Sequence, residues 1–243
     1  MEQKSMKQIQ TGIPGLDDIL DGGIPEKKVI MLNGYAGTGK TIFSTQFLVG
    51  GIENQQAAVY VTFEETTQEI IDNTRAFGWK LESLIEEKKL IFVEVFASEE
   101  SVRIVREVDD LTPLIERIKL AIKKNNAKRV VLDSITALLM ALKSKDVVRR
   151  ELHRLSAILK HMGCTILMIS EVPEVSFEQT ATVLSRYGVE EFVADGLITL
   201  YFRPEGMTRE RYIEVRKMRG VHHKIGVYPF EITNHGIVIK PRA

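Results

Sequence analysis

The sequence has one cysteine, no net charge and no long hydrophobic run, and each lack excludes a class of protein. With Cys164 alone, the chain can form neither an intramolecular disulfide nor a cysteine-based metal cluster. Because 33 Lys and Arg residues balance 33 Asp and Glu residues, no overall positive field draws the protein onto nucleic acid or membrane. No stretch approaches the roughly 18–20 apolar residues that a membrane helix needs. The N-terminal segment, MEQKSMKQIQ, lacks the hydrophobic core of a signal peptide, so we expect a soluble, cytoplasmic protein.

The chain instead contains alternating strand-forming and helix-forming segments, and its 243 residues are enough for a well-buried core. Strands that alternate with helices indicate a mostly parallel sheet with helices on both faces. The clearest helix precedes Gly163, because apolar side chains recur at helical spacing behind Asp146, which we expect to be its N-cap. We expect strands at 28–33, 57–63, 90–96, 129–132 and 164–170, and helices at 40–53, 66–77, 111–125 and 146–162.

After residue 195 the pattern changes to successive short strands joined by turns, which we expect at 196–202, 211–219, 227–232 and 236–240. Such a run indicates an antiparallel β extension that follows the parallel core. Neither an internal repeat nor a linker rich in Gly, Ser or Pro divides the sequence. We therefore expect one α/β domain over residues 1–243.

Residues 34–41, GYAGTGKT, match the phosphate-binding pattern G-x-x-x-x-G-K-[ST] at every fixed position. The glycines allow the backbone N–H groups to curl around phosphates, and the following helix adds its positive dipole end. Lys40 bridges the β- and γ-phosphates, and the Thr41 hydroxyl is a hard oxygen ligand for Mg²⁺. We therefore expect ATP or ADP with Mg²⁺, bound by Gly34, Ala36, Gly37, Thr38, Gly39, Lys40, Thr41 and Ile42.

A second metal ligand is expected at Asp133, which ends the apolar run VVLD at 130–133. An apolar strand that delivers an acid at its carboxyl end is the arrangement of a Walker B aspartate, which reaches Mg²⁺ directly or through water. The alternative is structural, because Asp133 and Ser134 are both good N-caps for a following helix, with Ser134 the better candidate.

Glu64 and Glu65 are candidates for the carboxylate that orients or deprotonates the attacking water. Both directly follow the strand at 57–63, so they lie at the sheet edge where α/β folds bind ligands. The alternative is that these acids complement the dipole of the helix expected from Thr66.

Longer stretches resemble the RecA-like ATPases, and within these P-loop NTPases the KaiC-type branch. The similar segments are 11–41, 61–79, 185–200 and 211–220, so the resemblance extends over nearly the whole chain. It implies a RecA-like fold, hydrolysis of ATP to ADP and phosphate, and a general base at Glu64, with Glu65 beside it. The family's K-x-R element falls on Lys217 and Arg219.

In the family's rings the K-x-R element reaches the γ-phosphate of a neighbouring subunit, so the resemblance implies a homo-oligomer, a hexamer in its relatives, with nucleotide at subunit interfaces. The alternative for Lys217 and Arg219 is an exposed strand edge whose charge opposes aggregation. Arg75 and Phe77 match positions near the adenine, and His223 matches a histidine near the interfacial nucleotide. The family's prototype has two such domains and autophosphorylates a Ser-Thr pair; the matching positions are Glu191 and Phe192, so we expect no autokinase activity.

Three roles are compatible with these residues. The first is an oligomeric ATPase that acts as a regulatory switch and is read by a partner protein. The second is an ATPase like the RadA paralogues that binds single-stranded DNA through Lys143, Lys145, Arg149 and Arg150 and a loop at 173–186 containing Phe177, although these cations equally fit the exposed face of a helix. The third is a nucleotide-sensing scaffold that does not hydrolyse ATP.

Overall fold

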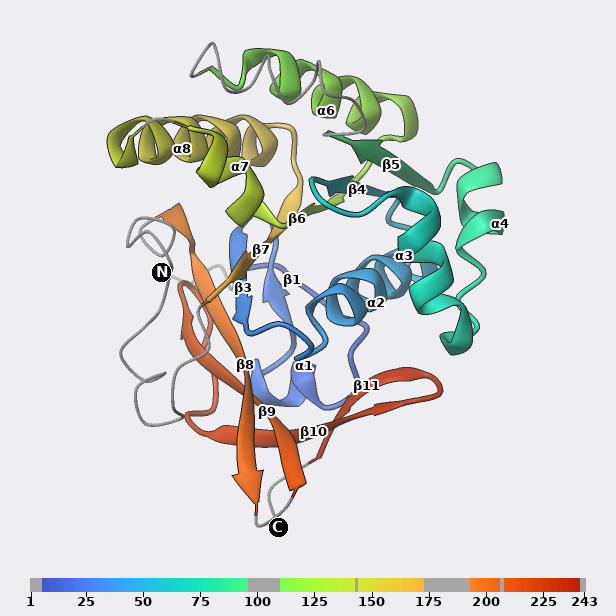
Figure 1. Ribbon diagram of the computed structural model, residues 1–243, viewed down its shortest axis with the longest axis vertical. Helices are drawn as coiled ribbons and strands as arrows, with labels where there is room; N and C mark the ends of the chain where they lie inside the picture. The colour runs from blue at the N-terminus through green and yellow to red at the C-terminus, as the bar shows by residue number, and fades with distance from the viewer. Residues whose placement is uncertain (1–5, 96–109, 143, 173–192, 206–207, 241–243) are drawn as a thin grey trace, which may run out of the picture.

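The computed structural model describes residues 6–95, 110–142, 144–172, 193–205 and 208–240, and it has the expected α/β architecture (Figure 1). The strands of its main sheet are β3 (Val29–Gly34), β4 (Ala58–Thr62), β5 (Leu90–Glu94), β6 (Arg129–Asp133), β7 (Thr165–Glu171), β8 (Gly196–Glu205), β9 (Thr208–Met218), β10 (Val227–Thr233) and β11 (Gly236–Ile239). Within the described residues their order is β11-β10-β9-β8-β3-β7-β6-β4-β5. Neighbouring strands are parallel from β5 to β8 and antiparallel from β8 to β11. The sheet therefore joins a parallel core to an antiparallel extension, as expected.

Helices pack on both faces of this sheet. One apolar core lies under α1 (Leu16–Ile19), α2 (Lys40–Glu53), α3 (Thr67–Thr74) and α4 (Leu81–Glu86), and the other lies under α6 (Thr112–Asn125), α7 (Ile135–Ala141) and α8 (Lys145–His161). Figure 1 shows these groups on opposite sides of β3, β6 and β7. In β3, Ile30 and Leu32 belong to the first core, whereas Val29 and Met31 belong to the second. Burial on both faces explains why the strands read as continuous apolar runs.

The structure corrects two predicted helix boundaries. The N-cap of α8 is Ser144, not Asp146, because the Ser144 side chain accepts a hydrogen bond of 3.3 Å from the Val147 N–H, which leaves Asp146 in the first turn. The predicted helix at 66–77 is α-helical only to Thr74, and Arg75–Phe77 form a 3₁₀ turn.

Several short elements were not predicted: β1 (Gln8–Ile9), β2 (Ile24–Pro25), α1, α4 and α7. Each is too short to show a periodic apolar pattern. The predicted residues Phe96, Lys143, 173–186 (with Phe177), Glu191 and Phe192 lie outside the described part of the chain.

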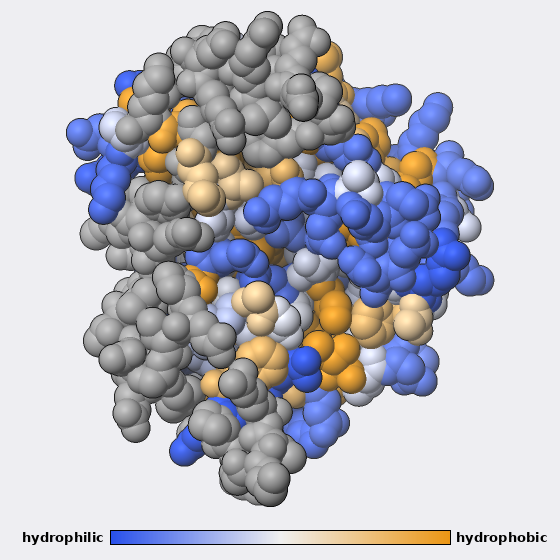
Figure 2. Space-filling model, in the orientation of Figure 1, coloured by the Kyte–Doolittle hydropathy of each residue, from blue (hydrophilic) through white to orange (hydrophobic). Residues whose placement is uncertain are grey.

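The surface of the described residues carries both hydrophilic and apolar side chains (Figure 2). In the view of Figure 2, hydrophilic side chains gather over α3 and α4, on the right. The large apolar side chains that are exposed, Met6, Leu120, Met140 and Ile225, come from separate parts of the sequence. None of the described helices is both apolar enough and long enough to cross a bilayer.

Candidate functional site

The phosphate loop connects the end of β3 to the start of α2, and its glycines are required by its shape. Gly37 and Gly39 have φ angles of 77° and 103°, in the left-handed region that favours glycine. A Cβ on Gly34 would lie 2.6 Å from the Thr38 Oγ1, whereas a Cβ on Gly37 would meet nothing within 4 Å. The Thr38 hydroxyl donates to the Tyr35 carbonyl at 2.8 Å and closes the loop. The loop is therefore tightly curled, with open space beside Gly37.

This loop forms one wall of a cavity of ≈ 450 Å³. The opposite wall consists of residues that follow β4 and β6, which are neighbours with Thr62 paired to Asp133. The cavity thus lies at the carboxyl edge of the parallel strands, where α/β sheets bind ligands. Its lining residues are Ala36, Gly37, Gly39, Lys40, Thr41, Ile42, Glu64, Glu65, Asp133, Ser134, Glu171, Arg211 and Ile232.

Lys40 is nearly buried, and two oxygens hold its ammonium group at the cavity. Its Nζ donates to the Tyr35 carbonyl at 2.8 Å and forms an ion pair of 3.3 Å with the Glu171 Oε1. Glu171 ends β7, and its side chain is 42% exposed. Glu171 was not among the predicted site residues, although it directly follows the strand predicted at 164–170 and so obeys the same rule as Asp133 and Glu64.

Asp133 lies at the end of β6 in a strongly negative environment. Desolvation raises the pKa of its carboxyl to about 6, and repulsion from Glu65 and Glu64 adds to the rise, whereas a hydrogen bond from Tyr60 and the charge of Lys40 lower it. A divalent cation beside Asp133 would relieve this repulsion. The hydroxyl of Thr41 and the carboxylate of Asp133 are hard oxygen donors of the kind that Mg²⁺ prefers, so the residues present fit this ion.

No group of three His, Cys, Asp or Glu side chains in the described ranges has a metal-binding arrangement. A site of two protein oxygens agrees with Mg²⁺, which usually takes its other ligands from phosphates and water.

The two glutamates are held by different partners. The Glu64 Oε2 accepts a hydrogen bond of 3.0 Å from the Ser134 hydroxyl, and the Glu65 Oε1 accepts one of 3.0 Å from the Asn73 amide. Desolvation raises the pKa of Glu65, although the bond from Asn73 opposes that rise.

Neither glutamate is needed to cap α3. Thr66 and Glu69 form a capping box, and the Thr67 N–H donates to the Glu94 Oε1 at 2.8 Å. Both glutamates line the cavity, and their catalytic role stays a prediction. Ser134, the predicted N-cap of the helix after β6, donates its hydroxyl proton to Glu64.

Lys217 and Arg219 lie at the opposite end of the strands from the phosphate loop. Gly34 pairs with Leu200 of β8, whereas Lys217 pairs with Leu197, three residues earlier and therefore about 10 Å away along the strand. The Lys217 Nζ donates to the Ala194 carbonyl at 2.7 Å, and the Arg219 side chain is exposed. β10 pairs with β9 only along residues 211–214, so among the described residues the side of β9 away from β8 has no strand partner at Lys217, and the edge-strand alternative for these cations stays a prediction.

The remaining predicted nucleotide contacts lie outside the cavity. Arg75 forms ion pairs with Asp72 at 2.9 Å and Glu82 at 3.2 Å, beside a separate pocket of ≈ 250 Å³. Phe77 stacks on Trp79 with ring centroids 4.8 Å apart. His223 is half-buried between β9 and β10.

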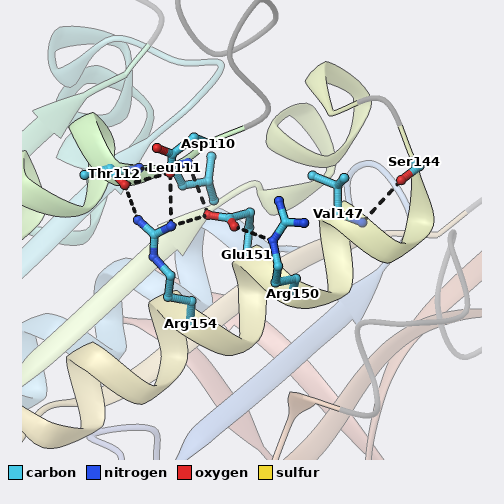
Figure 3. Close-up of polar contacts among 8 residues, drawn as sticks. All are labelled: Asp110, Leu111, Thr112, Ser144, Val147, Arg150, Glu151 and Arg154. Carbon is cyan, nitrogen blue, oxygen red and sulfur yellow. Dashed lines mark hydrogen bonds and ion pairs between the residues drawn. The ribbon is translucent and has the colours of Figure 1, made fainter.

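Part of the predicted basic cluster is tied into the fold (Figure 3). The Arg150 Nε donates to the buried Glu151 at 3.0 Å, and Glu151 also accepts from the Leu111 N–H at 3.2 Å, at the start of α6. Arg154 bridges Glu151 and Asp110, at 3.1 and 3.0 Å. This network joins α8 to α6, and Lys145, Arg149 and Arg150 all lie on the exposed face of α8, with the Arg150 side chain 62% exposed.

Comparison with known proteins gives a consistent result. A family model described as "ATPase: KaiC" matches residues 9–243. The circadian clock oscillator protein KaiC of Synechococcus elongatus is 45% identical over 241 residues, which are 99% of this chain and 45% of that protein. The KaiC of Nostoc sp. is 44% identical over 237 residues, 97% of this chain and 44% of that protein. The chain thus spans less than half the length of these curated relatives.

A solved structure of a KaiC-like protein also matches this chain, and the match covers that protein's whole chain. The crystal structure of a KaiC-like protein from Pyrococcus horikoshii OT3 superposes with a TM-score of 0.82 at 35% sequence identity, and the match covers 97% of this chain and 100% of that one.

Proposed function

This chain belongs to the KaiC family of ATPases, and from that premise we propose that it binds ATP with Mg²⁺ and hydrolyses it to ADP and phosphate. The observation that best supports this is the cavity, because it brings the phosphate loop together with Asp133, Glu64 and Glu65. Phosphoryl transfer depends mainly on positioning and electrostatic stabilisation, and this arrangement supplies both.

Each wall of the cavity has a proposed task. The curled loop presents backbone N–H groups to the phosphates, and Lys40 exchanges its contact with Glu171 for phosphate oxygens. Thr41 and Asp133 hold Mg²⁺, which neutralises phosphate charge when bound. Glu64 orients the attacking water and accepts its proton, and the bond from Ser134 fixes the Glu64 carboxylate for this task.

The site is completed by a second copy of the chain. Lys217 and Arg219 lie at the far end of β9 from their own cavity, so we assign them to the nucleotide of a neighbouring subunit. Such an arrangement places nucleotide at the interfaces of a homo-oligomer, with the six-membered ring of the relatives as the expected form. Occupancy of the interface by ATP or ADP then changes subunit packing, and a partner protein reads that change.

The switch role is preferred to single-strand DNA binding. Lys145, Arg149 and Arg150 are exposed on α8, but Arg150 forms an ion pair with Glu151, and the described part of this cluster contains no aromatic side chain. Binding of single strands usually adds stacking aromatic side chains to such cations. A salt titration of oligonucleotide binding tests this choice, because backbone binding weakens steeply with salt.

The test of hydrolysis compares two variants by calorimetry and phosphate release. Glu64→Gln should bind ATP with near wild-type affinity and lose at least about 100-fold in turnover, because general-base catalysis is worth about 10²–10⁴-fold. Lys40→Ala should lose binding itself. A scaffold without hydrolysis would show no phosphate release from the wild-type protein, and equal turnover of Glu64→Gln and wild type would reject Glu64 as the base.

A further inference from the structure

Tyr60 is a buried tyrosine whose hydroxyl points at the candidate metal site. It lies in β4, paired with Val131 of β6, and its side chain is 0% exposed. Its ring stacks on Phe92 with centroids 5.2 Å apart, which fixes the ring plane. Its hydroxyl donates to the Asp133 Oδ2 at 2.5 Å. The side chain therefore crosses from the middle of β4 to the carboxyl edge of the sheet.

A second hydrogen bond extends this contact to α2. The Tyr60 hydroxyl lies 3.2 Å from the Ser44 Oγ, and the Ser44 hydroxyl also donates to the Thr41 carbonyl at 3.0 Å. Since the single Tyr60 proton is committed to Asp133, the phenol oxygen accepts from Ser44, whose own single proton is therefore shared between the Tyr60 oxygen and the Thr41 carbonyl in a three-centre hydrogen bond. Asp133 and Thr41, which lie on separate elements, are thus joined through two buried hydroxyls.

We propose that Tyr60, through these two hydrogen bonds, is a positioning residue that sets the Asp133 carboxylate relative to Thr41 for a divalent cation. The inference rests on the proposed function, in which these two residues hold Mg²⁺. Engaging Oδ2 with Tyr60 leaves Oδ1 for the cation and restricts rotation of the carboxylate. Partners that orient a metal ligand in this way typically change metal affinity by about 10–100-fold when removed.

A purely structural role is the competing explanation, and a matched residue separates the two. Tyr201 of β8 is also buried, at 3% exposure, and its hydroxyl also donates to a carboxylate, that of Glu214. Neither Tyr201 nor Glu214 lines the cavity. Tyr201→Phe therefore removes a similar hydrogen bond away from the metal site.

The experiment measures ATP affinity by calorimetry with Mg²⁺ and with EDTA, for wild type, Tyr60→Phe, Ser44→Ala and Tyr201→Phe. Tyr60→Phe should lower the Mg²⁺-dependent gain in affinity by about tenfold or more. Its affinity in EDTA should stay unchanged. Ser44→Ala should shift the gain in the same direction by less, because Asp133 keeps its bond from Tyr60. Tyr201→Phe should match wild type.

A direct readout uses Mn²⁺ in place of Mg²⁺, with bound metal counted by electron paramagnetic resonance in the presence of ADP. We expect Tyr60→Phe to lose the most bound Mn²⁺, Ser44→Ala to lose less, and Tyr201→Phe to match wild type. If Tyr60→Phe and Ser44→Ala both behave like Tyr201→Phe, the inference is overturned; if Tyr60→Phe does not fold, Ser44→Ala alone decides it. Loss of the Mg²⁺ effect in the wild-type protein would instead overturn the proposed function.

Discussion

The two edges of the parallel sheet differ in how far their carboxylates are paired with positive charge. At the carboxyl edge, which we call the phosphate edge, Glu64, Glu65 and Asp133 crowd together, and desolvation with mutual repulsion raises the pKa of Asp133 to about 6. At the amino edge, which we call the opposite edge, Asp195 accepts hydrogen bonds from the Lys160 Nζ at 2.9 Å and from the Val29 N–H at 3.0 Å. The first edge keeps unbalanced negative charge, whereas the second neutralises it.

Buried Arg129, at the start of β6, is held at this opposite edge by hydrogen bonds to neutral groups. Its guanidinium donates to the Gln10 and Phe47 carbonyls and to the Gln56 side chain, and it stacks over the Phe47 ring at 4.5 Å. Unbalanced charge is costly in a folded protein and is expected where a ligand supplies the missing partner. The comparison therefore supports the proposed ligand site at the phosphate edge and a structural role for Asp195 and Arg129 at the opposite edge.

Arg219, at the opposite edge, has an exposed side chain that forms no ion pair with any described residue. If it serves the neighbouring subunit, Arg219→Ala should lower turnover by about 10³–10⁵-fold while ATP remains bound at the phosphate loop, since a finger cation stabilises the charge of phosphoryl transfer. Phosphate release and calorimetry measure the two effects separately.

Mixing inactive subunits tests whether this action crosses an interface. In a mixture of Glu64→Gln and Arg219→Ala chains, some interfaces combine an intact Glu64 with an intact Arg219, so activity should partly return. No recovery in assemblies shown by native mass spectrometry to be mixed would contradict the trans assignment of Arg219.

Asp195 tests the structural character of the opposite edge through pH. Desolvation opposes ionisation, but the hydrogen bonds from Lys160 and Val29 outweigh it and lower the pKa of Asp195 below its ordinary value. A lowered folded-state pKa stabilises the fold at pH above the unfolded value of about 3.9, and this stabilisation is lost as pH falls through the folded-state pKa. Asp195→Asn should therefore cost about 1–3 kcal/mol at pH 7 and progressively less below about pH 4.

Urea unfolding between pH 3 and pH 7 gives this difference as a function of pH. Asp72→Asn is the matched control, because Asp72 is an exposed aspartate in a surface ion pair with Arg75 and should change stability by less than about 1 kcal/mol. A pH-independent cost for Asp195→Asn would show that packing, not charge, explains the effect of the substitution.

The same comparison explains which features the sequence could predict. The parallel core and its antiparallel extension follow from the pattern of alternating segments, and the positions of Asp133 and Glu64 follow from the rule that acids at carboxyl strand ends face ligands. Tyr60 and Arg211 were missed because an aromatic or basic residue inside a strand looks like any other strand residue. Their place depends on cross-strand contacts, Tyr60 with Asp133 and Arg211 with Phe202, which no local pattern encodes. The Ser144 cap was missed for a smaller reason, because Asp146, two residues later, is an equally good capping residue type.

Glu171 gives the smallest effect and the finest test of the phosphate edge. Its ion pair with Lys40 competes with phosphate for the same ammonium group, so Glu171→Gln should tighten ATP binding. Because Glu171 is partly exposed, the pair is worth at most about 1 kcal/mol, which corresponds to about a fivefold change in the dissociation constant. Glu231→Gln, which removes an exposed pair with Lys240 and lies outside the cavity, should leave affinity unchanged. Weaker binding by Glu171→Gln would mean instead that Glu171 holds Lys40 in its binding position, and the surplus of acid at this edge would then serve to orient the lysine before the nucleotide arrives.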